Sequence, residues 1–503
     1  MAEKKKVIII GAGLAGMSVG SYLQMNGFET IIFESHTQCG GLCTSWKRGD
    51  YLIDGCVHFM AGTSPEQNFY QFWNDLIDIS SLDIVYSDTH AVVEDLNHNR
   101  FHFYSNINNL HEEMLKTAPE DKVLINHFIK NLKKFTRIKF PVSKPMETMA
   151  FSDKLKAAYH LVPFLPSMNK FMKITNHEFA LKFKNPILRD AFEMAFEPDM
   201  PLFYTIMPLV WRHQKDTGYP KGGAVKLSTL LEKNYLSLGG KIQYHSRVQK
   251  IITEKAVTKG IVLENNNEHF ADLVISASDG RTAIYDMLEG KFKDKNIVER
   301  YESTEVFQPL DKTLYVSLGV NADFSDQPSK IYFPIETPIY VDSKTTLREL
   351  EITHYCDDPA SAPKGKSLIA LMPDSKDWEY WFNLRNSDKQ KYNEEKMRVA
   401  NAIIDALDKR FGNIKANLEM VDVATPATYI RYTNNWTGGQ ISWKSTKKTF
   451  GKPITWQIKG LENFYMTGQW AGTSGGLNNV VMMGSHLAQI ICKKEKRKFI
   501  NHK

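Results

Sequence analysis

Cysteine is scarce in this sequence, and its positions disfavour several kinds of site. The five cysteines among 503 residues are Cys39, Cys43, Cys56, Cys356 and Cys492. A small, odd number fits a chain kept in a reducing compartment rather than a disulfide-rich secreted protein. Neither the cysteines nor the scattered histidines have the paired spacing of zinc ligands, so we expect no metal site. Cys39 and Cys43 are separated by three residues instead of two, which disfavours a redox-active pair.

Other hallmark motifs are missing as well. The sequence contains no G-x-S-x-G and no phosphate-binding P-loop, which disfavours α/β-hydrolase and P-loop chemistry. No apolar run reaches the roughly 18 residues that a membrane-spanning helix needs. A second glycine motif after a strand, which a separate NAD(P)H-binding domain requires, is also absent. Redox chemistry would therefore exchange electrons with oxygen, a quinone or NAD(P)H bound transiently elsewhere.

The composition is ordinary, and the charge is mild but uneven. Hydrophobic residues make up 42% and charged residues 24%, as in soluble proteins, and the length suggests two or three domains. The net charge is +6, and Lys493–Lys498 holds five basic residues and one Glu. This tail is either a solvated terminus or a segment attracted to an anionic membrane surface. No nucleic-acid-binding module accompanies it, so we expect no nucleic acid partner. Lys4–Lys6 before an apolar stretch imitate a secretory signal, but no cleavage site follows; we expect a cytoplasmic chain, with peripheral association at the inner face of a membrane as an alternative.

The N-terminal segment has the pattern of a dinucleotide-binding unit. Val7–Ile10 is a short β-branched apolar run, which predicts a buried parallel strand. It leads into the G-A-G-L-A-G of Gly11–Gly16 and then into a segment of helical composition that ends at Met25. A second apolar run, Thr30–Phe33, ends at Glu34. Strand, glycine turn, helix, strand and acid thus occur in the order of a Rossmann unit.

Each residue type in this unit suits the binding of a pyrophosphate. Gly11 permits the tight turn, Gly13 lets the backbone approach the phosphates, and Gly16 lets the helix pack on the strand. The helix N-terminus supplies amide donors and positive potential. Glu34, 18 residues after Gly16, is placed to accept hydrogen bonds from a ribose diol and would repel a 2′-phosphate.

A second glycine pair favours FAD over NAD as the dinucleotide. Gly40 and Gly41 follow the acid by a few residues, where a flavin fold lays its backbone along the pyrophosphate and the ribityl chain. Lys47 and Arg48 come next; they either contact phosphate or form an exposed basic turn.

With these motifs the sequence resembles the phytoene desaturase family, which includes carotenoid isomerases and retinol saturases and lies within the amine-oxidase-like flavoproteins. The first matching block is the N-terminal unit as far as His58. The second begins with the Y-P-K-G-G of Tyr219–Gly223 and continues to the strand Ala271–Ala277. The resemblance implies that the P-x-G-G loop lies beside the flavin and that Val248 meets the adenine end.

The most specific block lies near the C-terminus. Asn463–Gln469 is followed by Gly475–Leu477 and a segment of helical composition to about Cys492. The resemblance implies that this strand, loop and helix pass under the flavin, where the helix N-terminus would stabilise the negative charge of reduced flavin. The family often has an acid or another group in place of Gln469, so this residue is a departure. The FAD-binding residues that follow from the motifs and the resemblance are Gly11, Gly13, Leu14, Ala15, Gly16, Glu34, Ser35, Gly40, Gly41, Leu42, Val248, Gly468, Gln469, Gly476 and Leu477.

The resemblance also implies the domain organisation. We expect an α/β fold in which a Rossmann-type FAD-binding domain alternates along the chain with a discontinuous α+β substrate domain. The FAD-binding domain would comprise residues 1–81, 218–300 and 453–503, and the substrate domain residues 82–217 and 301–452. The second insert contains Ala424–Tyr432, which also resembles the family; the first insert resembles it weakly and would encode substrate identity.

One segment of the first insert favours a lipophilic substrate. Phe151–Lys173 mixes large apolar residues with lysines, and Pro163 and Pro166 would divide it into two short helices. It is either a cap packed on its own domain or an amphipathic segment that enters a membrane interface. The apolar set is Leu155, Leu161, Val162, Phe164, Leu165, Met168 and Phe171.

The chemistry that the resemblance implies is hydride transfer between a substrate carbon and flavin N5, with a proton moved by a side chain. His58 is the first candidate for that proton and Tyr219 the second, although a structural role for His58 is equally open. Trp46 and Trp470 would shape the cavity. The favoured function is a desaturase or saturase of a polyene, isoprenoid or fatty-acid-like lipid. A double-bond isomerase, an amine oxidase and a non-catalytic lipid escort are the alternatives.

Overall fold

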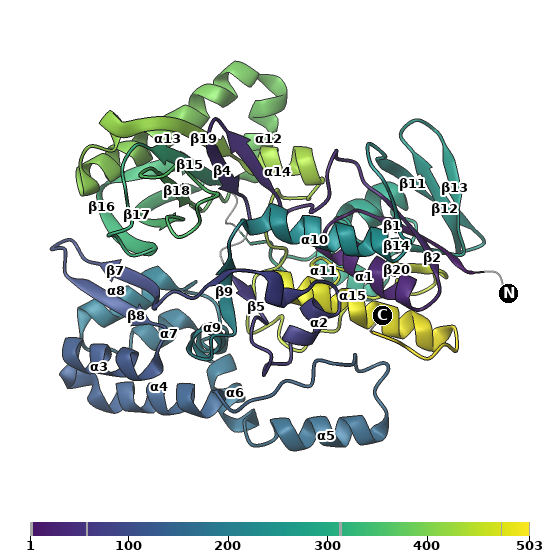
Figure 1. The fold of residues 1–503 in the computed structure, drawn as a ribbon, viewed down its shortest axis with the longest axis horizontal. Helices are drawn as coiled ribbons and strands as arrows, with labels where there is room; N and C mark the ends of the chain where they lie inside the picture. The colour runs from purple at the N-terminus through teal and green to yellow at the C-terminus, as the bar shows by residue number, and fades with distance from the viewer. Residues whose placement is uncertain (1–3, 57–58, 311–313, 474, 502–503) are drawn as a thin grey trace.

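A computed structural model describes residues 4–56, 59–310, 314–473 and 475–501 (Figure 1). Its N-terminal strand lies in the middle of a parallel sheet with the order β10-β2-β1-β14-β20. The strands are β1 (Lys6–Ile10), β2 (Glu29–Phe33), β10 (Lys241–Gln243), β14 (Leu273–Ser276) and β20 (Phe464–Met466). The sheet therefore joins segments that lie far apart in the sequence. The predicted α/β class with a Rossmann-type sheet is confirmed.

Three helices pack around this sheet: α1 (Leu14–Met25), α10 (Gly223–Ser237) and α15 (Leu477–Lys494). Helix α1 contacts both of the others. A Cβ atom at Gly484 would lie 2.3 Å from the Ser18 hydroxyl, which instead donates to the carbonyl of Val481 at 2.8 Å. The absence of a side chain at Gly484 thus lets α15 approach α1 closely.

Smaller elements complete this half of the molecule. An antiparallel sheet of β11 (Val248–Glu254), β12 (Val257–Leu263) and β13 (Glu268–Phe270) projects from it. Beyond β14 come a π-helix, Thr282–Met287, and α11 (Lys295–Tyr301). The remaining short elements here are α2 (Tyr70–Asn74), β5 (Met60–Ala61), β6 (Ile84–Val85), β9 (Thr217–Pro220) and the 3-10 helix Ile79–Ser81. Two more 3-10 helices, Pro119–Asp121 and Lys415–Asn417, belong to the first and the second insert.

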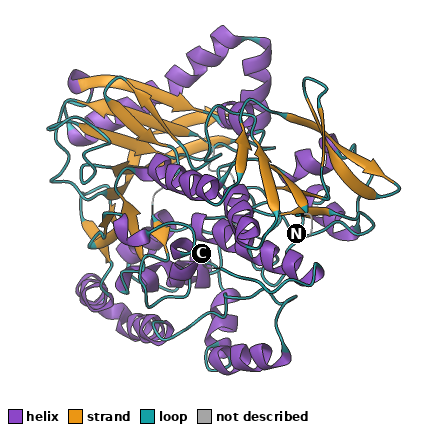
Figure 2. Ribbon diagram, turned by 45° about the vertical axis from the view of Figure 1, so that its right-hand side comes forward, coloured by secondary structure: helices purple, strands orange, loops and turns teal. Residues whose placement is uncertain are grey.

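The second large sheet is mixed and has the order β19-β15-β18-β17-β16-β7-β8 (Figure 2, strands in orange). Its β7 pairs in parallel with β16 through Val92 opposite Ile331, so the two inserts share one sheet. Helices α12 (Trp378–Ser387), α13 (Lys389–Phe411) and α14 (Pro426–Thr433) belong to this half. The strands are β7 (Thr89–Glu94), β8 (Arg100–Tyr104), β15 (Tyr315–Val320), β16 (Lys330–Asp342), β17 (Thr345–His354), β18 (Ser367–Leu371) and β19 (Leu418–Ala424).

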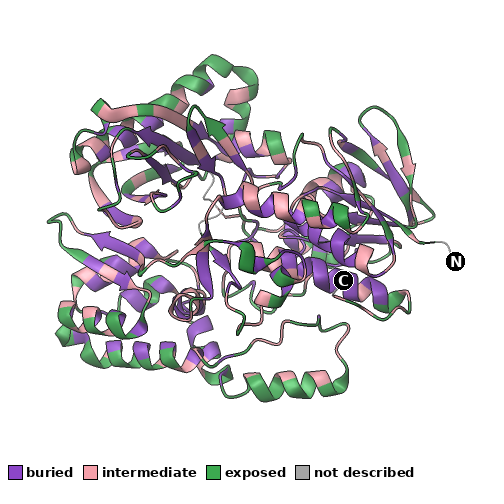
Figure 3. Cartoon of the chain, viewed as in Figure 1, coloured by how far each residue is buried: buried purple, intermediate pink, exposed green. Residues whose placement is uncertain are grey.

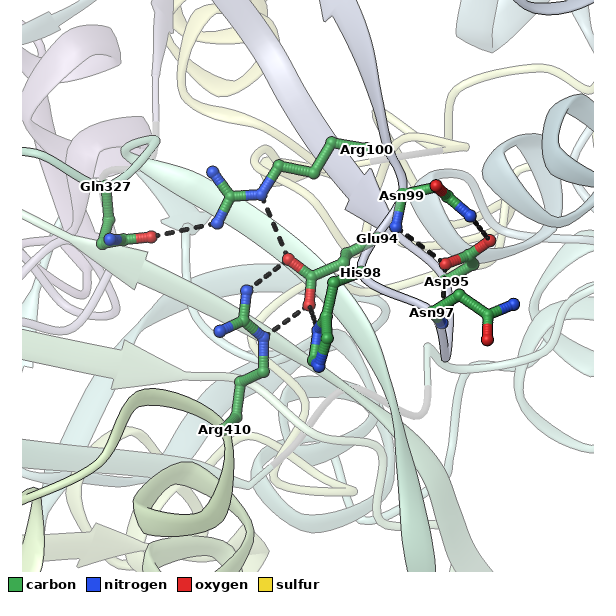
Figure 4. A network of polar contacts seen from close by, with 8 residues as sticks. All are labelled: Glu94, Asp95, Asn97, His98, Asn99, Arg100, Gln327 and Arg410. Carbon is green, nitrogen blue, oxygen red and sulfur yellow. Dashed lines mark hydrogen bonds and ion pairs between the residues drawn. The ribbon is translucent and has the colours of Figure 1, made fainter.

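A buried carboxylate reinforces the junction of the two inserts (Figure 4). Glu94 at the end of β7 accepts hydrogen bonds from Nε and Nη2 of the Arg410 guanidinium on α13, one at each carboxylate oxygen. It also binds Arg100 at 3.1 Å and His98 at 2.9 Å, while its own side chain is only 1% exposed. Arg100 continues the network to Gln327 at 3.3 Å.

Helices of the first insert form a separate layer with its own aromatic core. The helices are α3 (Ile107–Thr117), α4 (Lys122–Phe135), α5 (Phe151–Leu161), α6 (Leu165–Met172), α7 (Asn176–Ala180), α8 (Pro186–Ala195) and α9 (Phe203–His213). The core includes Phe103, Phe128, Phe135, Phe179, Phe183 and Phe192. Helix α5 is the exception, because none of its residues is buried (Figure 3). Of the two prolines predicted to break this segment, Pro163 separates α5 from α6, but Pro166 lies in the first turn of α6, where proline is tolerated.

The hairpin of β3 (Ser45–Arg48) and β4 (Tyr51–Asp54) connects the two halves. Tyr51 and Ile53 pack with Tyr315 of the seven-stranded sheet, whose hydroxyl donates to the carbonyl of Asp54 at 2.6 Å. Among the described residues, no helix is both long and apolar enough to cross a membrane.

Candidate functional site

A cavity of about 720 Å³ runs between the two halves of the molecule. Its walls come from the glycine turn after β1, the loop that follows β2, the hairpin β3–β4, the N-terminus of α15 and helices α12, α13 and α14. The cavity therefore joins the parallel sheet to the sheet shared by the inserts. This volume lies within the range of natural cofactor and ligand sites.

The glycine turn is held open by hydrogen bonds to the neighbouring strands. Gly11, with φ of +100°, donates its N–H to the carbonyl of Phe33 at 2.9 Å. The carboxylate of Glu34 accepts the N–H of Ala12 at 2.7 Å and that of His36 at 2.8 Å. Glu34 thus fixes the shape of the turn while it lines the cavity; Oε1 also accepts the Ser35 hydroxyl at 3.2 Å, and Oε2 retains capacity for a further donor.

The second glycine pair lies directly against the first. Gly40 donates its N–H to the carbonyl of Ala12 at 2.9 Å. A Cβ atom at Gly41 would lie 3.3 Å from the Cα atom of Gly13, and one at Gly40 only 2.3 Å from the carbonyl oxygen of Cys43. Both residues have positive φ, so side chains here would strain the backbone and crowd the turn.

Two helices present uncapped N-termini to the same cavity. Helix α1 begins after Gly13 and α15 after Gly476; neither cap residue has a side chain, and neither first turn contains an acid. The N–H groups at such ends have no partner within the helix and carry positive potential, which favours anions. The site therefore fits a dinucleotide, whose pyrophosphate needs donors of this kind.

Of the fifteen residues predicted to bind the cofactor, all except Gly16 line this cavity. Gly16 lies behind it: a Cβ atom there would be 2.0 Å from the carbonyl oxygen of Gly11. That position agrees with the expected role of Gly16 in helix–strand packing. Trp46 and Trp470 also line the cavity, and the indole N–H of Trp470 donates to the side chain of Asn435 at 2.6 Å.

The two proton-transfer candidates have different outcomes. His58 lies outside the described residues. Tyr219 is not among the residues that line the cavity; its hydroxyl donates to Asp358 at 3.0 Å and its ring lies 5.5 Å from that of Tyr355. Burial, followed by the nearby charges of Asp54 and Asp358, raises the pKa of Tyr219 far above its ordinary value. The phenol is therefore held protonated, and its catalytic role stays a prediction.

Several residues that line the cavity lie outside every motif recognised in the sequence. Asp279, just after β14, is buried and accepts the N–H groups of Thr282 at 2.8 Å and Trp436 at 3.2 Å. Burial raises its pKa to about 6, which places its titration in the range useful for acid–base chemistry. Residues on one face of α13 also line the cavity. They recur three and four positions apart, and this helical spacing is the sequence pattern that could have indicated their common face.

The cysteines beside the glycine motif are free thiols. Cys39 donates to the carbonyl of Ser228 at 3.6 Å, and Cys43 donates to that of Ala224 at 3.7 Å. Burial raises the pKa of Cys39 to about 12, so this thiol is protonated and unreactive. The two residues serve the contact between the glycine loop and α10.

Comparison with known proteins agrees with the geometry. Residues 9–76 match the model of an NAD(P)-binding Rossmann-like domain. The chain is 23% identical to a 4,4'-diapophytoene desaturase of Methylomonas sp., covering 99% of this chain and 97% of that protein. It is 24% identical to the chloroplastic prolycopene isomerase of Daucus carota, covering 90% of this chain and 75% of that protein. The resemblance to the phytoene desaturase family is confirmed.

A solved structure of an amine-oxidising enzyme has a similar fold. A solved structure of a putrescine oxidase triple mutant aligns with a TM-score of 0.62 at 12% identity, covering 98% of this chain and 99% of that one. Such a likeness shows a shared fold. The sequence relatives place this chain among homologues of oxidoreductases and isomerases, and residues 9–76 match a Rossmann-like dinucleotide-binding unit.

Proposed function

We propose that this chain is an FAD-dependent oxidoreductase that acts on carbon–carbon bonds of a lipophilic polyene, isoprenoid or fatty-acid-like substrate. The observation that carries the proposal is the single cavity, which runs from the uncapped N-terminus of α1 to a pocket between the two halves. The desaturase and isomerase relatives support this choice of chemistry. Double-bond isomerisation is the second candidate, because the carrot relative is a prolycopene isomerase.

The residues divide into those that would hold the flavin and those that would shape the substrate pocket. The amides around Gly13 and the Gly40–Gly41 backbone suit the pyrophosphate, Glu34 the ribose, and the N-terminus of α15 the pyrimidine ring. Bound flavin supplies hydride acceptance and donation. The apolar part of the lining would orient a hydrocarbon chain and exclude water; it includes Leu42, Phe59, Met372, Ile441, Leu477 and Val480.

The test is an anaerobic titration of the purified protein. We expect a yellow protein whose flavin is bleached by a saturated lipid if the enzyme desaturates, or by NAD(P)H and then reoxidised by a polyene if it saturates. A product with a moved double bond and an unchanged flavin spectrum would select isomerisation. A protein that stays colourless after refolding with excess FAD would refute the proposal, and so would a flavin that responds to neither lipid nor NAD(P)H while the lipid stays unchanged.

We also propose that the protein associates with a membrane surface through α5. Four apolar residues follow one another along α5 and its end at helical spacing, and all are exposed: Phe151 by 77%, Leu155 by 57%, Tyr159 by 79% and Val162 by 57%. The lysines of the same segment and of the C-terminal tail suit anionic lipids.

Hydrogen bonds connect these two basic regions. Lys144 binds Asp153 of α5 at 2.9 Å, and Lys493 of α15 donates to the carbonyl of Glu147 at 2.6 Å. The loop between Lys144 and Glu147 therefore holds α5 near the basic end of α15.

Vesicle flotation tests this surface. The double variant Leu155→Asp/Tyr159→Asp should lose binding to anionic vesicles without a change in melting temperature, because α5 buries no residue. Val123→Asp, at an 86% exposed position on α4, is the matched control and should bind as the wild type does. Equal binding by wild type and double variant would refute the role of α5.

A further inference from the structure

Four basic side chains that line the cavity come from elements other than the glycine turn and the parallel sheet. Arg48 comes from β3, Arg385 from the last turn of α12, and Lys389 and Lys396 from α13. We call these four residues the cationic cluster. On α13 the cavity-lining residues Lys389, Tyr392, Asn393 and Lys396 are spaced three, four and seven residues from the first, so one face of the helix points into the cavity.

The cationic cluster has little negative charge to balance it. Asp422 is the cavity-lining carboxylate that binds it, at 2.8 Å from Nε of Arg48, and its other oxygen accepts the indole N–H of Trp46 at 2.9 Å. Within the part of the chain that the structure describes, Arg385, Lys389 and Lys396 form no ion pair. The ammonium of Lys396 lies over the ring of Tyr392, 5.4 Å from its centroid.

The other carboxylates of the cavity are already engaged. Glu34 accepts the backbone N–H groups of Ala12 and His36, and Asp279 accepts those of Thr282 and Trp436. On the far side of α13, Glu395 pairs with Lys391 at 3.3 Å and with Arg398 at 2.8 Å. Among the described residues, Asp422 is thus the one cavity-lining carboxylate left to compensate the four cations, and it forms its ion pair with Arg48.

The like charges act on one another. Burial, and then the charges of Arg48 and Arg385 against the single favourable charge of Asp422, lower the pKa of Lys396. The N-terminus of α13 is capped by the carboxylate of Asp388, which accepts the N–H of Lys391 at 2.9 Å, so the positive charge facing the cavity comes from the side chains rather than from the helix end. Like charges held together in a cavity favour an anion, because a bound anion relieves their mutual repulsion.

We propose that the cationic cluster is a binding subsite for the phosphate or carboxylate group of a second ligand, distinct from the resident dinucleotide. This inference rests on the proposed function and deepens it. The residues predicted to hold the dinucleotide lie around the parallel sheet, whereas three of the four cations belong to helices of the other half. An anionic group bound there would direct the rest of the second ligand along the shared cavity.

Two kinds of ligand carry the required chemistry. One is a reduced nicotinamide dinucleotide, the electron donor, bound through its phosphates. The other is a lipid substrate with an acidic end. Both are recognised by the same charge-assisted hydrogen bonds, so the experiment must separate them.

The experiment measures by calorimetry how tightly the flavin-loaded protein binds inorganic pyrophosphate, which is the first probe. The double variant Lys389→Gln/Lys396→Gln should bind pyrophosphate at least about tenfold more weakly than the wild type, because each charged hydrogen bond lost costs about that factor. Lys391→Gln is the matched control on the same helix, since Lys391 is 52% exposed and pairs with Glu395 outside the cavity. This control should bind as the wild type does. Arg385→Gln repeats the test from α12.

Two further arms identify the source of the anion. Competition of pyrophosphate with NADH or NADPH would assign the subsite to a nicotinamide. Competition with a fatty acid, but not with its methyl ester, would assign it to an acidic lipid. Either result supports the subsite, and competition by neither would overturn it.

The remaining outcomes are also decisive. The inference would be overturned if Lys389→Gln/Lys396→Gln and Arg385→Gln both bound pyrophosphate as tightly as the wild type. It would also be overturned if these variants lost their flavin, because the cationic cluster would then serve the resident cofactor. A colourless wild type refutes the proposed function. A yellow wild type that binds no pyrophosphate refutes the subsite alone.

Discussion

The carboxylate of Glu94 offers a direct test of how the two inserts are joined. Glu94→Gln removes the charge that faces Arg410 and Arg100 but keeps the shape of the side chain. Because Glu94 is 1% exposed, the variant leaves the Arg410 guanidinium, 18% exposed, without its anion. Breaking one side of a buried pair costs about 3–5 kcal/mol. At an unfolding entropy of about 2.1 cal/mol/K per residue, about 3 kcal/mol corresponds to a fall of about 5 °C in melting temperature if the two inserts unfold together.

Thermal unfolding monitored by circular dichroism measures this effect. The matched control is Glu336→Gln, because Glu336 forms a pair with Lys409 in which both side chains are more than 60% exposed. Exposed pairs contribute little, so the control should melt as the wild type does. If Glu94→Gln melts no lower than Glu336→Gln, the buried network does not stabilise the junction.

The same carboxylate predicts a pH dependence. Burial alone would raise the pKa of Glu94, but hydrogen bonds from Arg410, His98 and Arg100 outweigh it and leave the pKa below its ordinary value. A lowered pKa in the folded state stabilises the protein above the unfolded value of about 4.3, and this contribution is lost as the pH falls through the folded pKa. The difference in melting temperature between wild type and Glu94→Gln should therefore be largest near neutral pH and shrink in acid.

Three further predictions concern other sites. Gly16→Ala would place a Cβ atom 2.0 Å from a backbone atom and should lower the melting temperature of the apoprotein. In Gly13→Ala the nearest atom to the Cβ would be 3.9 Å away, so this variant should melt as the wild type does and lose only affinity for FAD. Equal melting temperatures of the two variants would contradict this prediction. Arg300 is 2% exposed and donates to the Thr455 hydroxyl and to the carbonyls of Gly472 and Pro453. Arg300→Met should therefore cost about 3 kcal/mol of stability and reduce the flavin-to-protein absorbance ratio, and Arg300→Lys should not restore that ratio. Full flavin content in either variant would refute a role of Arg300 in shaping the cofactor site. The Cys356 thiol lines a second cavity of about 390 Å³, and hydrogen bonding to His354 outweighs burial and lowers its pKa. Cys356 should therefore react with iodoacetamide faster than the buried cysteines, as measured by mass spectrometry. The variant His354→Asn should slow this reaction.

The glycine motifs and apolar runs were sufficient to predict the Rossmann unit. The strand Val7–Ile10, the turn at Gly11 and the helix that follows lie within a few residues of their positions in the structure. These features are local, because a turn with positive φ, a buried parallel strand and a helix start each leave a signal in adjacent residues. The cofactor-binding roles assigned to them, and the domain boundaries, remain predictions.

Tertiary structure alone decided the other wall of the cavity. Arg385, Lys396 and Asp422 come from separate elements of the second insert, and nothing in their local sequence indicates that they meet Arg48 of the first hairpin. The pairing of β7 with β16 is equally non-local, since Val92 and Ile331 lie more than 200 positions apart in the sequence. Such contacts depend on how whole sheets and helices pack, and a buried charge is recognisable only once its surroundings are known. Interactions between neighbouring residues in the sequence thus determined the glycine turn, whereas the packing of whole elements determined which charged side chains line the other wall of the cavity.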